Sequence, residues 1–382
     1  MSARVRLGVE NVGAVDPILR GRRVGLLTNA AATDSALVPT VDLVAARYDV
    51  RLLFGPEHGV RGDLAAGKAV ASGVDEPTGI RVRSLYGERR APSPEELDAI
   101  DVLAVDLPDI GSRYYTYLST LAHAMRACAG AGVPVVVLDR PNPLGGAIVE
   151  GGVLRPEFAS FVGMYPIPVR PGLTIAEYAR LVNELQPACE LHQAPLSGWR
   201  RAWGYRDLGL PWVMPSPNIP TPETALVYVG TCLFEGTNVS EGRGTAKPFL
   251  LFGAPWLDPR RVRATVDVRR LAGAALRETV FRPLASKHAN DVCRGFELHL
   301  VAPDRFRPYA AAVAILDAIR RTHDEFVFLP PSAPGERPFI DLLAGTDELR
   351  RPGAGVDAYL ERCAIEADAF LTRRAPYLLY PE

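Results

Sequence analysis

Two polar clusters, far apart in the chain, hold the residues with the clearest capacity for chemistry. The first is a loop over residues 214–256 that contains Glu235, Asn238, Glu241 and Arg243 within nine residues. Its proline residues restrict the backbone and its glycine residues allow tight turns. Its carboxylates and hydrogen-bond donors suit a polar ligand such as a sugar. The second cluster is Phe54-Gly-Pro-Glu-His-Gly59. The function depends on whether the two clusters face one cleft.

Glu57 and His58 follow a Gly-Pro pair that would fix the backbone and point the carboxyl group away from a strand end. Such a carboxyl group acts as a general acid if partial burial raises its pKa towards neutrality. Alternatively, Glu57 caps a helix or pairs with Arg61. His58 either bonds to the backbone or orients Glu57; a metal site with Asp106 or Asp109 is disfavoured because no His-x-His or His-Glu-x-x-His spacing occurs.

A third motif places an acid, an arginine and tyrosines next to one another. It runs Asp109-Ile-Gly-Ser-Arg-Tyr-Tyr-Thr-Tyr117 and contains Arg113 and Tyr115. Tyrosine rings stack on sugars and their hydroxyl groups bind sugar hydroxyls, but tyrosine also fills the edges of protein cores. Both interpretations stay open for Tyr115 and Tyr117.

Several common chemistries lack their motifs. The first expected strand is followed by Asn29-Ala-Ala-Ala32 in place of Gly-x-Gly-x-x-Gly, and no Gly-x-x-x-x-Gly-Lys-Ser/Thr occurs, which disfavours NAD and ATP. Ser216 and Ser240 do not lie in a Gly-x-Ser-x-Gly elbow. We therefore expect no cofactor and no metal.

Composition sets the broad class of the protein. The 382 residues carry 43 basic and 44 acidic side chains, a formal net charge of −1 that gives no sign of a nucleic-acid partner. The five cysteines are odd in number and form no Cys-x-x-Cys pair, as in a reducing compartment. No signal peptide and no run of about 20 apolar residues is visible. We expect a cytoplasmic protein without a membrane span, unless a signal has been removed.

The first part of the chain alternates between strand-like and helix-like patterns. Strands are expected at 23–28, 50–54, 80–85, 102–106 and 133–138, and helices at 37–47, from 93, and at 117–129. This alternation predicts an α/β domain with an open parallel sheet covered on both faces. Glycine pairs at 145–146 and 151–152 place a domain boundary between domains at 1–148 and 149–382. The second domain is expected to be α+β, with helices at 174–185, 309–321 and 356–373 and a strand at 296–301.

Polar residues follow four of these expected strands. They are Asn29, Glu57, Asp106 with Asp109, and Asp139 with Arg140 and Asn142. Because open α/β sheets bind ligands at the carboxyl ends of their strands, the site is expected at this edge.

The motifs together resemble the NamZ family of exo-β-N-acetylmuramidases. The motifs are Phe54–Gly59, Asp106–Tyr117, Asp139-Arg-Pro-Asn-Pro-Leu-Gly-Gly146, Met214-Pro-Ser-Pro-Asn218 and Glu235–Thr245, and the resemblance spans nearly the whole chain. It implies a Rossmann-like doubly wound domain, a smaller second domain and an active site in the cleft between them. It also implies release of N-acetylmuramic acid from the non-reducing ends of peptidoglycan fragments, with the family's proposed catalytic glutamate falling on Glu57.

We therefore expect a glycosidase of cell-wall turnover that acts on an oligosaccharide or muropeptide, with Glu57 as general acid assisted by His58. The residues expected to bind substrate are Asn29, Arg61, Asp106, Asp109, Arg113, Tyr115, Tyr117, Asp139, Arg140, Asn142, Asn218, Glu235, Asn238, Glu241 and Arg243. Two other functions stay open: a sugar-binding protein without turnover, and a metal-dependent amidase or deacetylase.

The second catalytic group and the basis of selectivity remain open at this point. Asp106, Asp109, Glu235 and Glu241 are candidates for base or nucleophile, and the 2-acetamido group of the substrate is another. Muramic acid carries a lactyl carboxylate that glucosamine lacks, so selectivity needs a cation. Arg113, Arg140 and Arg243 all lie in the polar motifs; Arg243 is the first choice and Arg140 the second. The alternative is that Arg243 pairs with Glu235 or Glu241.

Overall fold

The larger of two sheets positions the polar residues that follow its strands. The structure, a computed structural model, describes residues 5–62, 73–351 and 355–382. Within them the sheet has seven strands: β1 (Arg23–Thr28), β2 (Asp49–Gly55), β3 (Gly73–Val74), β4 (Arg81–Ser84), β5 (Val102–Asp106), β6 (Val135–Leu138) and β7 (Leu191–Ala194). Their order is β3-β4-β2-β1-β5-β6-β7, and all neighbours pair in parallel except β3 with β4. This is a Rossmann-type order with its switch point between β1 and β5, where ligands bind in such sheets.

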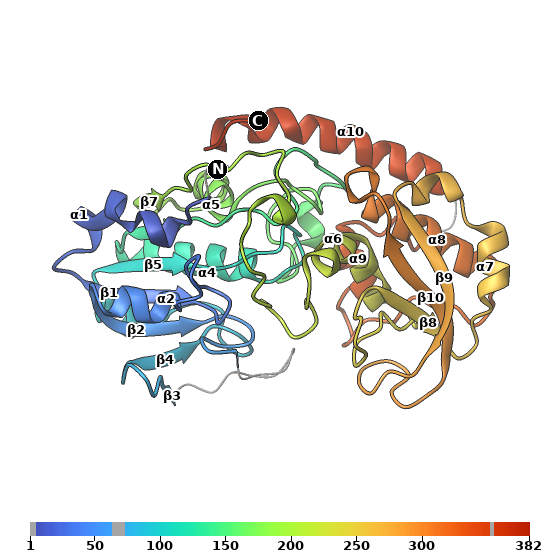
Figure 1. The fold of residues 1–382 in the computed structure, drawn as a ribbon, viewed down its shortest axis with the longest axis horizontal. Coiled ribbons are helices and arrows are strands. Elements are labelled where there is room, and N and C mark those ends of the chain that lie inside the picture. Colours follow the sequence, from blue (N-terminus) through green and yellow to red (C-terminus); the bar gives the residue numbers. More distant parts are fainter. Residues whose placement is uncertain (1–4, 63–72, 352–354) are drawn as a thin grey trace.

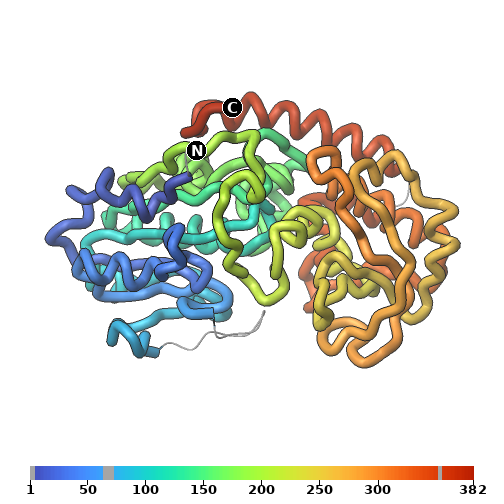
Figure 2. The backbone as a smooth tube through the Cα atoms, in the orientation of Figure 1, coloured from blue at the N-terminus to red at the C-terminus, as the bar shows by residue number. Residues whose placement is uncertain are grey.

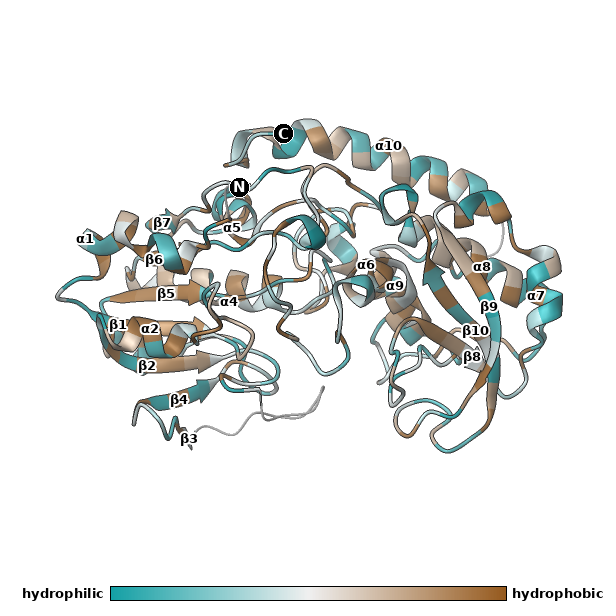
Figure 3. Ribbon diagram, in the orientation of Figure 1, coloured by the Kyte–Doolittle hydropathy of each residue, from teal (hydrophilic) through white to brown (hydrophobic). Residues whose placement is uncertain are grey.

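Helices cover both faces of this sheet, which is why its central strands are mostly apolar. All residues of β5 and β6 are buried, and the strand β5 is mostly brown in Figure 3. One face packs on η1 and α2, and the other on α4 and α5. The helices of this part are η1 (Gly8–Val15), α1 (Asp16–Leu19), α2 (Thr40–Ala45), α3 (Pro94–Asp98), α4 (Tyr117–Ala131), η2 (Pro156–Phe158), α5 (Ile175–Leu185) and η3 (Tyr205–Asp207).

The second part of the chain builds a smaller sheet with helices. Its antiparallel strands are ordered β8 (Leu251–Ala254), β10 (Cys293–Leu300) and β9 (Ala274–Phe281). Its helices are α6 (Pro222–Thr231), η4 (Cys232–Gly236), α7 (Pro259–Thr265), η5 (Val268–Leu271), η6 (Pro303–Arg305), α8 (Pro308–Thr322), α9 (Phe339–Ala344), α10 (Val356–Arg374) and η7 (Ala375–Tyr377). The arrowheads of β2, β4 and β5 point towards this second part (Figure 1). The carboxyl edge of the large sheet therefore faces the smaller sheet.

The fold class is confirmed: a mostly parallel, doubly wound α/β sheet is followed by a smaller α+β part. The strands expected at 23–28, 50–54, 80–85, 102–106 and 133–138 correspond to β1, β2, β4, β5 and β6. The helix expected at 37–47 is shorter, because Pro39 precedes its first residue. The strand β7 belongs to the first sheet although it lies beyond residue 148, so the sheet continues past the expected boundary of the first domain.

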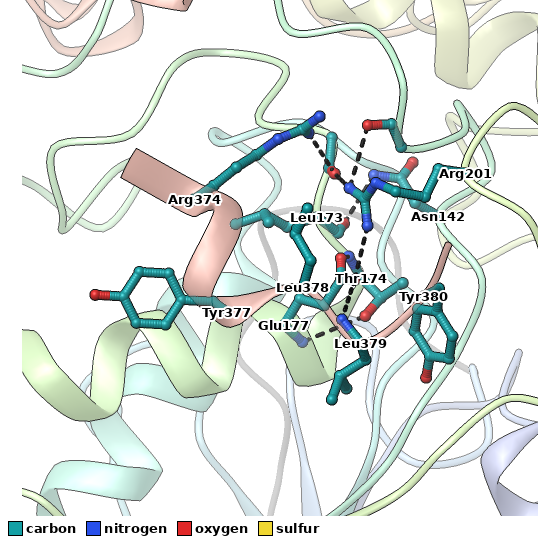
Figure 4. Close-up of polar contacts among 12 residues, drawn as sticks. Asn142, Leu173, Thr174, Glu177, Arg201, Arg374, Tyr377, Leu378, Leu379 and Tyr380 are labelled. Carbon is teal, nitrogen blue, oxygen red and sulfur yellow. Dashed lines mark hydrogen bonds and ion pairs between the residues drawn. The ribbon is translucent and has the colours of Figure 1, made fainter. Parts of the chain in front are cut away.

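The chain returns to the first part after α10. That helix runs along both parts (Figure 1), and the backbone tube in Figure 2 shows the C-terminal segment ending beside the first part. There the backbone amide of Leu379 donates to Glu177 at 2.9 Å, and the hydroxyl of Tyr380 donates to Asp139. Figure 4 shows Glu177 between Arg201 and Leu379, with Arg374 above them. We call residues 374–380 the C-terminal tie.

Candidate active site

Glu57 is carried by a tight turn at the carboxyl end of β2. The amide of Gly59 donates to the carbonyl of Pro56 at 3.0 Å, and His58 has a φ of 71°. A positive φ at the third position marks a type II turn, which usually has glycine there, so His58 holds an uncommon backbone conformation. The side chain of His58 is buried, whereas Glu57 is partly exposed. The turn therefore presents the carboxyl group of Glu57 at the sheet edge.

Two hydroxyl groups from other elements contact the carboxylate of Glu57. The Thr116 hydroxyl, just before α4, donates to its Oε2 at 3.1 Å. Tyr86, two residues beyond β4, also hydrogen-bonds to this carboxylate. Burial, followed by the charge of Glu57 and this hydrogen bond, raises the pKa of Tyr86 to about 12. Tyr86 therefore stays a protonated donor at neutral pH.

Tyr86 and Thr116 are not among the residues that were expected from the sequence to form the site. Tyr86 follows a strand end, so the same rule that selected Asn29 and Glu57 would have found it. The contact from Thr116 could not be found in this way, because Thr116 precedes a helix that lies 59 residues after Glu57 in the chain.

Asn29, Tyr115 and Tyr117 support the turn. The side-chain amide of Asn29 donates to the carbonyl of Gly59 at 3.3 Å, and the hydroxyl of Tyr117 donates to the carbonyl of Glu57 at 3.3 Å. The rings of Tyr115 and Tyr117 lie 4.6 Å apart, and both residues are buried. Packing of this kind is the structural interpretation that the sequence left open for these two tyrosines.

Asp109 is a second carboxyl group close to these tyrosines. Its Oδ2 accepts a hydrogen bond from the amide of Gly111 at 2.6 Å, whereas its buried Oδ1 has no hydrogen-bond partner in the described residues. Burial raises the pKa of Asp109 to about 7. The charges of Asp109 and Glu57 both raise the pKa of Tyr117, after burial as the main cause. Both carboxyl groups therefore lie within electrostatic range of one tyrosine.

Asp109 also lines a pocket at the carboxyl edge. Arg140, Tyr205, Trp212 and Pro215 line it with Asp109, and the segment around residues 200–221 lies between the two sheets in Figures 1 and 2. Glu57 does not line this pocket. Glu57 and the pocket are nevertheless adjacent. The hydroxyl of Tyr117, which contacts the carbonyl of Glu57, also contacts the carbonyl of Pro215 in the pocket lining at 3.0 Å.

Asp106 and Arg140 form an ion pair, and of the two only Arg140 lines the pocket. Both side chains are almost fully buried, and the Arg140 Nη2 lies 2.8 Å from the Asp106 Oδ2. The same Arg140 nitrogen donates to the carbonyl of Thr33 at 2.7 Å, and the hydroxyl of Thr40 donates to Asp106 at 2.5 Å. This network ties the loops after β1, β5 and β6 together.

The residues of the 235–243 loop form an ion-pair cluster. Arg243 Nη2 lies 2.6 Å from Glu235 and its Nε 3.4 Å from Glu241. The Nζ of Lys287 lies 2.8 Å from the other carboxylate oxygen of Glu241. The side chain of Glu241 is only 2 % exposed. Burial raises the pKa of Glu235, and the positive charge of Arg243 opposes this rise. Arg243 thus has the pairing that the sequence allowed as its structural alternative.

The two polar clusters are close enough to interact. The charge of Arg243 lowers the pKa of Tyr86, against burial and the charge of Glu57, which raise it. Since Tyr86 is hydrogen-bonded to Glu57, the 235–243 loop lies within electrostatic range of the turn that carries Glu57.

Other expected site residues bind protein groups. Arg61 pairs with Asp75 at 2.7 Å and with Asp42 at 2.8 Å. Arg113 is buried, and its guanidinium donates to the carbonyls of Gly152, Ile167 and Leu343. It therefore links the first part to α9.

Three asparagines and one aspartate among the expected substrate-binding residues also form hydrogen bonds within the protein. Asn142 donates to the carbonyl of Leu173 at 2.8 Å, and Asn238 donates to that of Glu325 at 2.8 Å. Asn218 is partly exposed, and its backbone amide donates to Ser216. Asp139 accepts from Thr174 and Ala176, and burial raises its pKa to about 7.

The described residues contain no group of three or more His, Cys, Asp or Glu side chains placed to hold a metal ion. In the same part of the chain, no helix is long and apolar enough to cross a membrane.

Two protein-family models match this chain and together cover most of it. The family model for the N-terminal part of exo-β-N-acetylmuramidase NamZ matches residues 24–223, and the model for its C-terminal part matches residues 226–380. The chain is 42 % identical to the peptidoglycan β-N-acetylmuramidase NamZ of Bacillus subtilis over 369 residues, covering 95 % of this chain and 88 % of that protein.

Two solved structures of DUF1343 family proteins from Bacteroides fragilis are also similar. The first has a TM-score of 0.87 at 32 % identity and covers 99 % of both chains. The second has a TM-score of 0.79 at 29 % identity and covers 100 % of both chains.

Proposed function

The chain belongs to the NamZ family of exo-β-N-acetylmuramidases, and we propose from this that it releases N-acetylmuramic acid from the non-reducing ends of peptidoglycan fragments in cell-wall turnover. The protein is a glycosidase by this relationship. The observation that supports the proposal most is the 42 % identity across 95 % of the chain. The placement of Glu57 at the carboxyl edge of a Rossmann-type sheet agrees with it.

Glu57 is the general acid in this proposal, and the substrate binds between the two parts. The carboxyl group of Glu57 gives its proton to the glycosidic oxygen as the bond from that oxygen to C1 breaks, so the leaving sugar departs as a neutral alcohol. Thr116 and Tyr86 hold the carboxyl group by hydrogen bonds, and His58 fixes the turn beneath it. Such fixed orientation is what proton transfer to a bound sugar requires.

Asp109 is the second carboxyl group in this proposal. The other three candidates have cationic partners: Asp106 has Arg140, and Glu235 and Glu241 share Arg243. Asp109 instead has a buried oxygen without a partner in the described residues and lines the edge pocket. As a base it takes a proton from the water that attacks C1, and its pKa of about 7 suits this role near neutral pH.

The pH dependence of turnover tests the role of Asp109. An ionised base is lost as the pH falls, so kcat should decrease below about pH 7, the pKa to which burial raises Asp109. Asp109→Asn should lower kcat by roughly 10²-fold and abolish this acidic limb of the profile. A wild-type rate that falls above pH 7 instead would mean that Asp109 donates the proton and that Glu57 has the other role.

The function itself is tested with two matched chromogenic substrates. We expect hydrolysis of an aryl β-N-acetylmuraminide and little hydrolysis of the matching β-N-acetylglucosaminide. Peptidoglycan fragments with muramic acid at the non-reducing end should lose that sugar first, whereas fragments that begin with glucosamine should remain intact. Binding without turnover would favour a sugar-binding protein.

Chelation separates a glycosidase from a metal-dependent amidase or deacetylase. We expect full activity after exhaustive dialysis against EDTA and without added nucleotide, because acid–base hydrolysis of a glycoside needs only carboxyl groups and water. Muraminide hydrolysis before and after dialysis is the measurement. Activity that is lost on chelation and restored by Zn²⁺ would contradict this expectation.

We also propose that the protein works in the cytoplasm. All five cysteines are buried free thiols, as expected for a reducing compartment. Fractionation of the source cells, with activity measured in the cytoplasmic and exported fractions, tests this location.

A further inference from the structure

An exposed arginine and an aromatic group lie beside the turn that carries Glu57. Tyr86 follows the carboxyl end of β4, and its ring centroid lies 6.1 Å from that of Phe161. Phe161 sits in a tight turn closed by hydrogen bonds between Ser160 and Gly163 at 2.8 and 3.1 Å. Both aromatic residues are partly exposed. Two such rings side by side offer a surface on which a sugar can pack.

Arg90 lies over this surface. The carbon of its guanidinium group is 4.3 Å from the centroid of the Phe161 ring, a distance at which the ring face attracts the cation. Arg90 is exposed and has no ion pair with any described residue. Arg83 and Arg89, by contrast, both pair with Glu96. The ring therefore positions Arg90 without neutralising its charge.

Arg90 and Glu57 both lie within electrostatic range of Tyr86. Its charge lowers the pKa of Tyr86, and Tyr86 is hydrogen-bonded to Glu57. His123 of α4 stacks on Phe161 with centroids 6.1 Å apart. Burial, then the charges of Arg126 and Arg90, lower the pKa of His123, so this histidine is neutral at pH 7 and adds no charge to the surface.

The substrate carries a carboxylate on the sugar whose glycosidic bond is cleaved. The lactyl group of muramic acid is attached to the same sugar ring that carries the scissile bond, so its carboxylate lies within about one ring of the general acid. The arginines expected for this task have other partners: Arg113 binds three carbonyls, Arg140 pairs with Asp106, and Arg243 pairs with two glutamates. Their charges are already compensated or used within the protein.

We propose that Arg90, held over Phe161, binds the lactyl carboxylate and so makes the enzyme selective for muramic acid over glucosamine. This proposal rests on the proposed function. Guanidinium and carboxylate form two parallel hydrogen bonds, and the Tyr86 and Phe161 rings supply the apolar surface for the sugar and the lactyl methyl group.

The test pairs variants of Arg90 with two substrates, one with a charged and one with a neutral lactyl group. The substrates are an aryl β-muraminide and its lactyl methyl ester. For the wild type, kcat/KM should be about 10- to 100-fold higher for the free acid than for the ester, the range expected for a hydrogen bond to a charged group. In Arg90→Ala, kcat/KM for the acid should fall to the value for the ester, which should itself stay close to that of the wild type.

Arg89→Ala is the matched control, because Arg89 is adjacent in sequence but pairs with Glu96. It should keep the wild-type ratio of acid to ester. Arg90→Gln keeps hydrogen-bond donors without the charge and should behave as Arg90→Ala, which guards against a folding defect in one variant. Arg243→Ala should lower kcat/KM for both substrates equally, since it releases Glu235 and Glu241.

The outcomes separate this proposal from the proposed function. A wild type that hydrolyses neither substrate overturns the glycosidase function. A wild type that prefers the acid and an Arg90→Ala variant that keeps this preference overturns the role of Arg90 alone. Equal losses on acid and ester in both Arg90 variants also overturn it, since they indicate a structural role. Loss of the preference in Arg243→Ala, and not in Arg90→Ala, would return the task to Arg243.

Discussion

Glu57→Gln is expected to lower kcat on a natural disaccharide with muramic acid at its non-reducing end by about 10²–10⁴-fold, the usual contribution of a positioned acid or base. The amide keeps the size and polarity of the side chain, so Thr116 and Tyr86 retain a hydrogen-bonding partner. Only the titrating proton is lost. The variant should therefore fold as the wild type does and bind substrate with a similar Kd, and both can be measured directly.

The leaving group of the substrate shows whether Glu57 is the acid. An aryl group that departs readily as an anion needs no proton, so the loss in Glu57→Gln should be much smaller for a dinitrophenyl muraminide than for a natural disaccharide. Equal losses on both substrates would indicate a nucleophile or base. Glu278→Gln is the control, because Glu278 is an exposed partner of Arg263 on β9. Near-normal turnover in Glu57→Gln would end the assignment.

Loss of one partner from the Glu177–Arg201 pair should strongly destabilise the fold. The two charges lie 2.7 Å apart and neither side chain is exposed. Arg201→Met leaves the carboxylate of Glu177 buried without its cation, which costs about 3–5 kcal/mol of the free energy of unfolding. The same carboxyl group also binds the amides of Thr174 and Leu379, so the start of α5 and the C-terminal tie should loosen together. Denaturant unfolding of the variant and the wild type measures the difference.

The double variant Glu177→Gln/Arg201→Met removes both charges and should cost clearly less than the sum of the single changes. Arg206→Ala is the surface control, since Arg206 and Glu223 form an ion pair with 67 % and 33 % of their side chains exposed; its cost should stay below about 1 kcal/mol. An Arg201→Met variant as stable as the wild type would show that solvent reaches Glu177.

The strands of the large sheet could be predicted because each is a short apolar run. β5 and β6 are buried on both faces, so their residues are apolar except for Asp106 at the end of β5. β7 was missed because its sequence, Leu-His-Gln-Ala, is partly exposed at the sheet edge. β9 was also missed, because none of its residues is buried and the charged pair Arg277-Glu278 interrupts its apolar pattern. The glycine pairs near residue 148 mark turns, and turns do not reveal which sheet the next strand will join.

The position of the site could be predicted more easily than the use of each charge. The strand ends at Asn29 and Glu57 do contact one turn. A sequence does not show which charges pair across long separations, such as Arg140 with Asp106, 34 residues apart. Tyr86 and Arg90 were overlooked although they follow the end of β4. Applying the strand-end rule to every strand would have included them.

The C-terminal tie affects how the protein is made. Asp139 and Tyr380 are 241 residues apart in the chain, and a ribosome that adds about 5–20 residues per second needs about 10–50 s to cover that distance. Once β7 has been made, the large sheet has all of its described strands, yet Asp139 still lacks its phenol and Glu177 still lacks the Leu379 amide. The nascent sheet must therefore keep these carboxyl groups hydrated or covered by a chaperone. A premature stop before residue 374 would leave a sheet that is complete in its strands and unfinished in its polar interior.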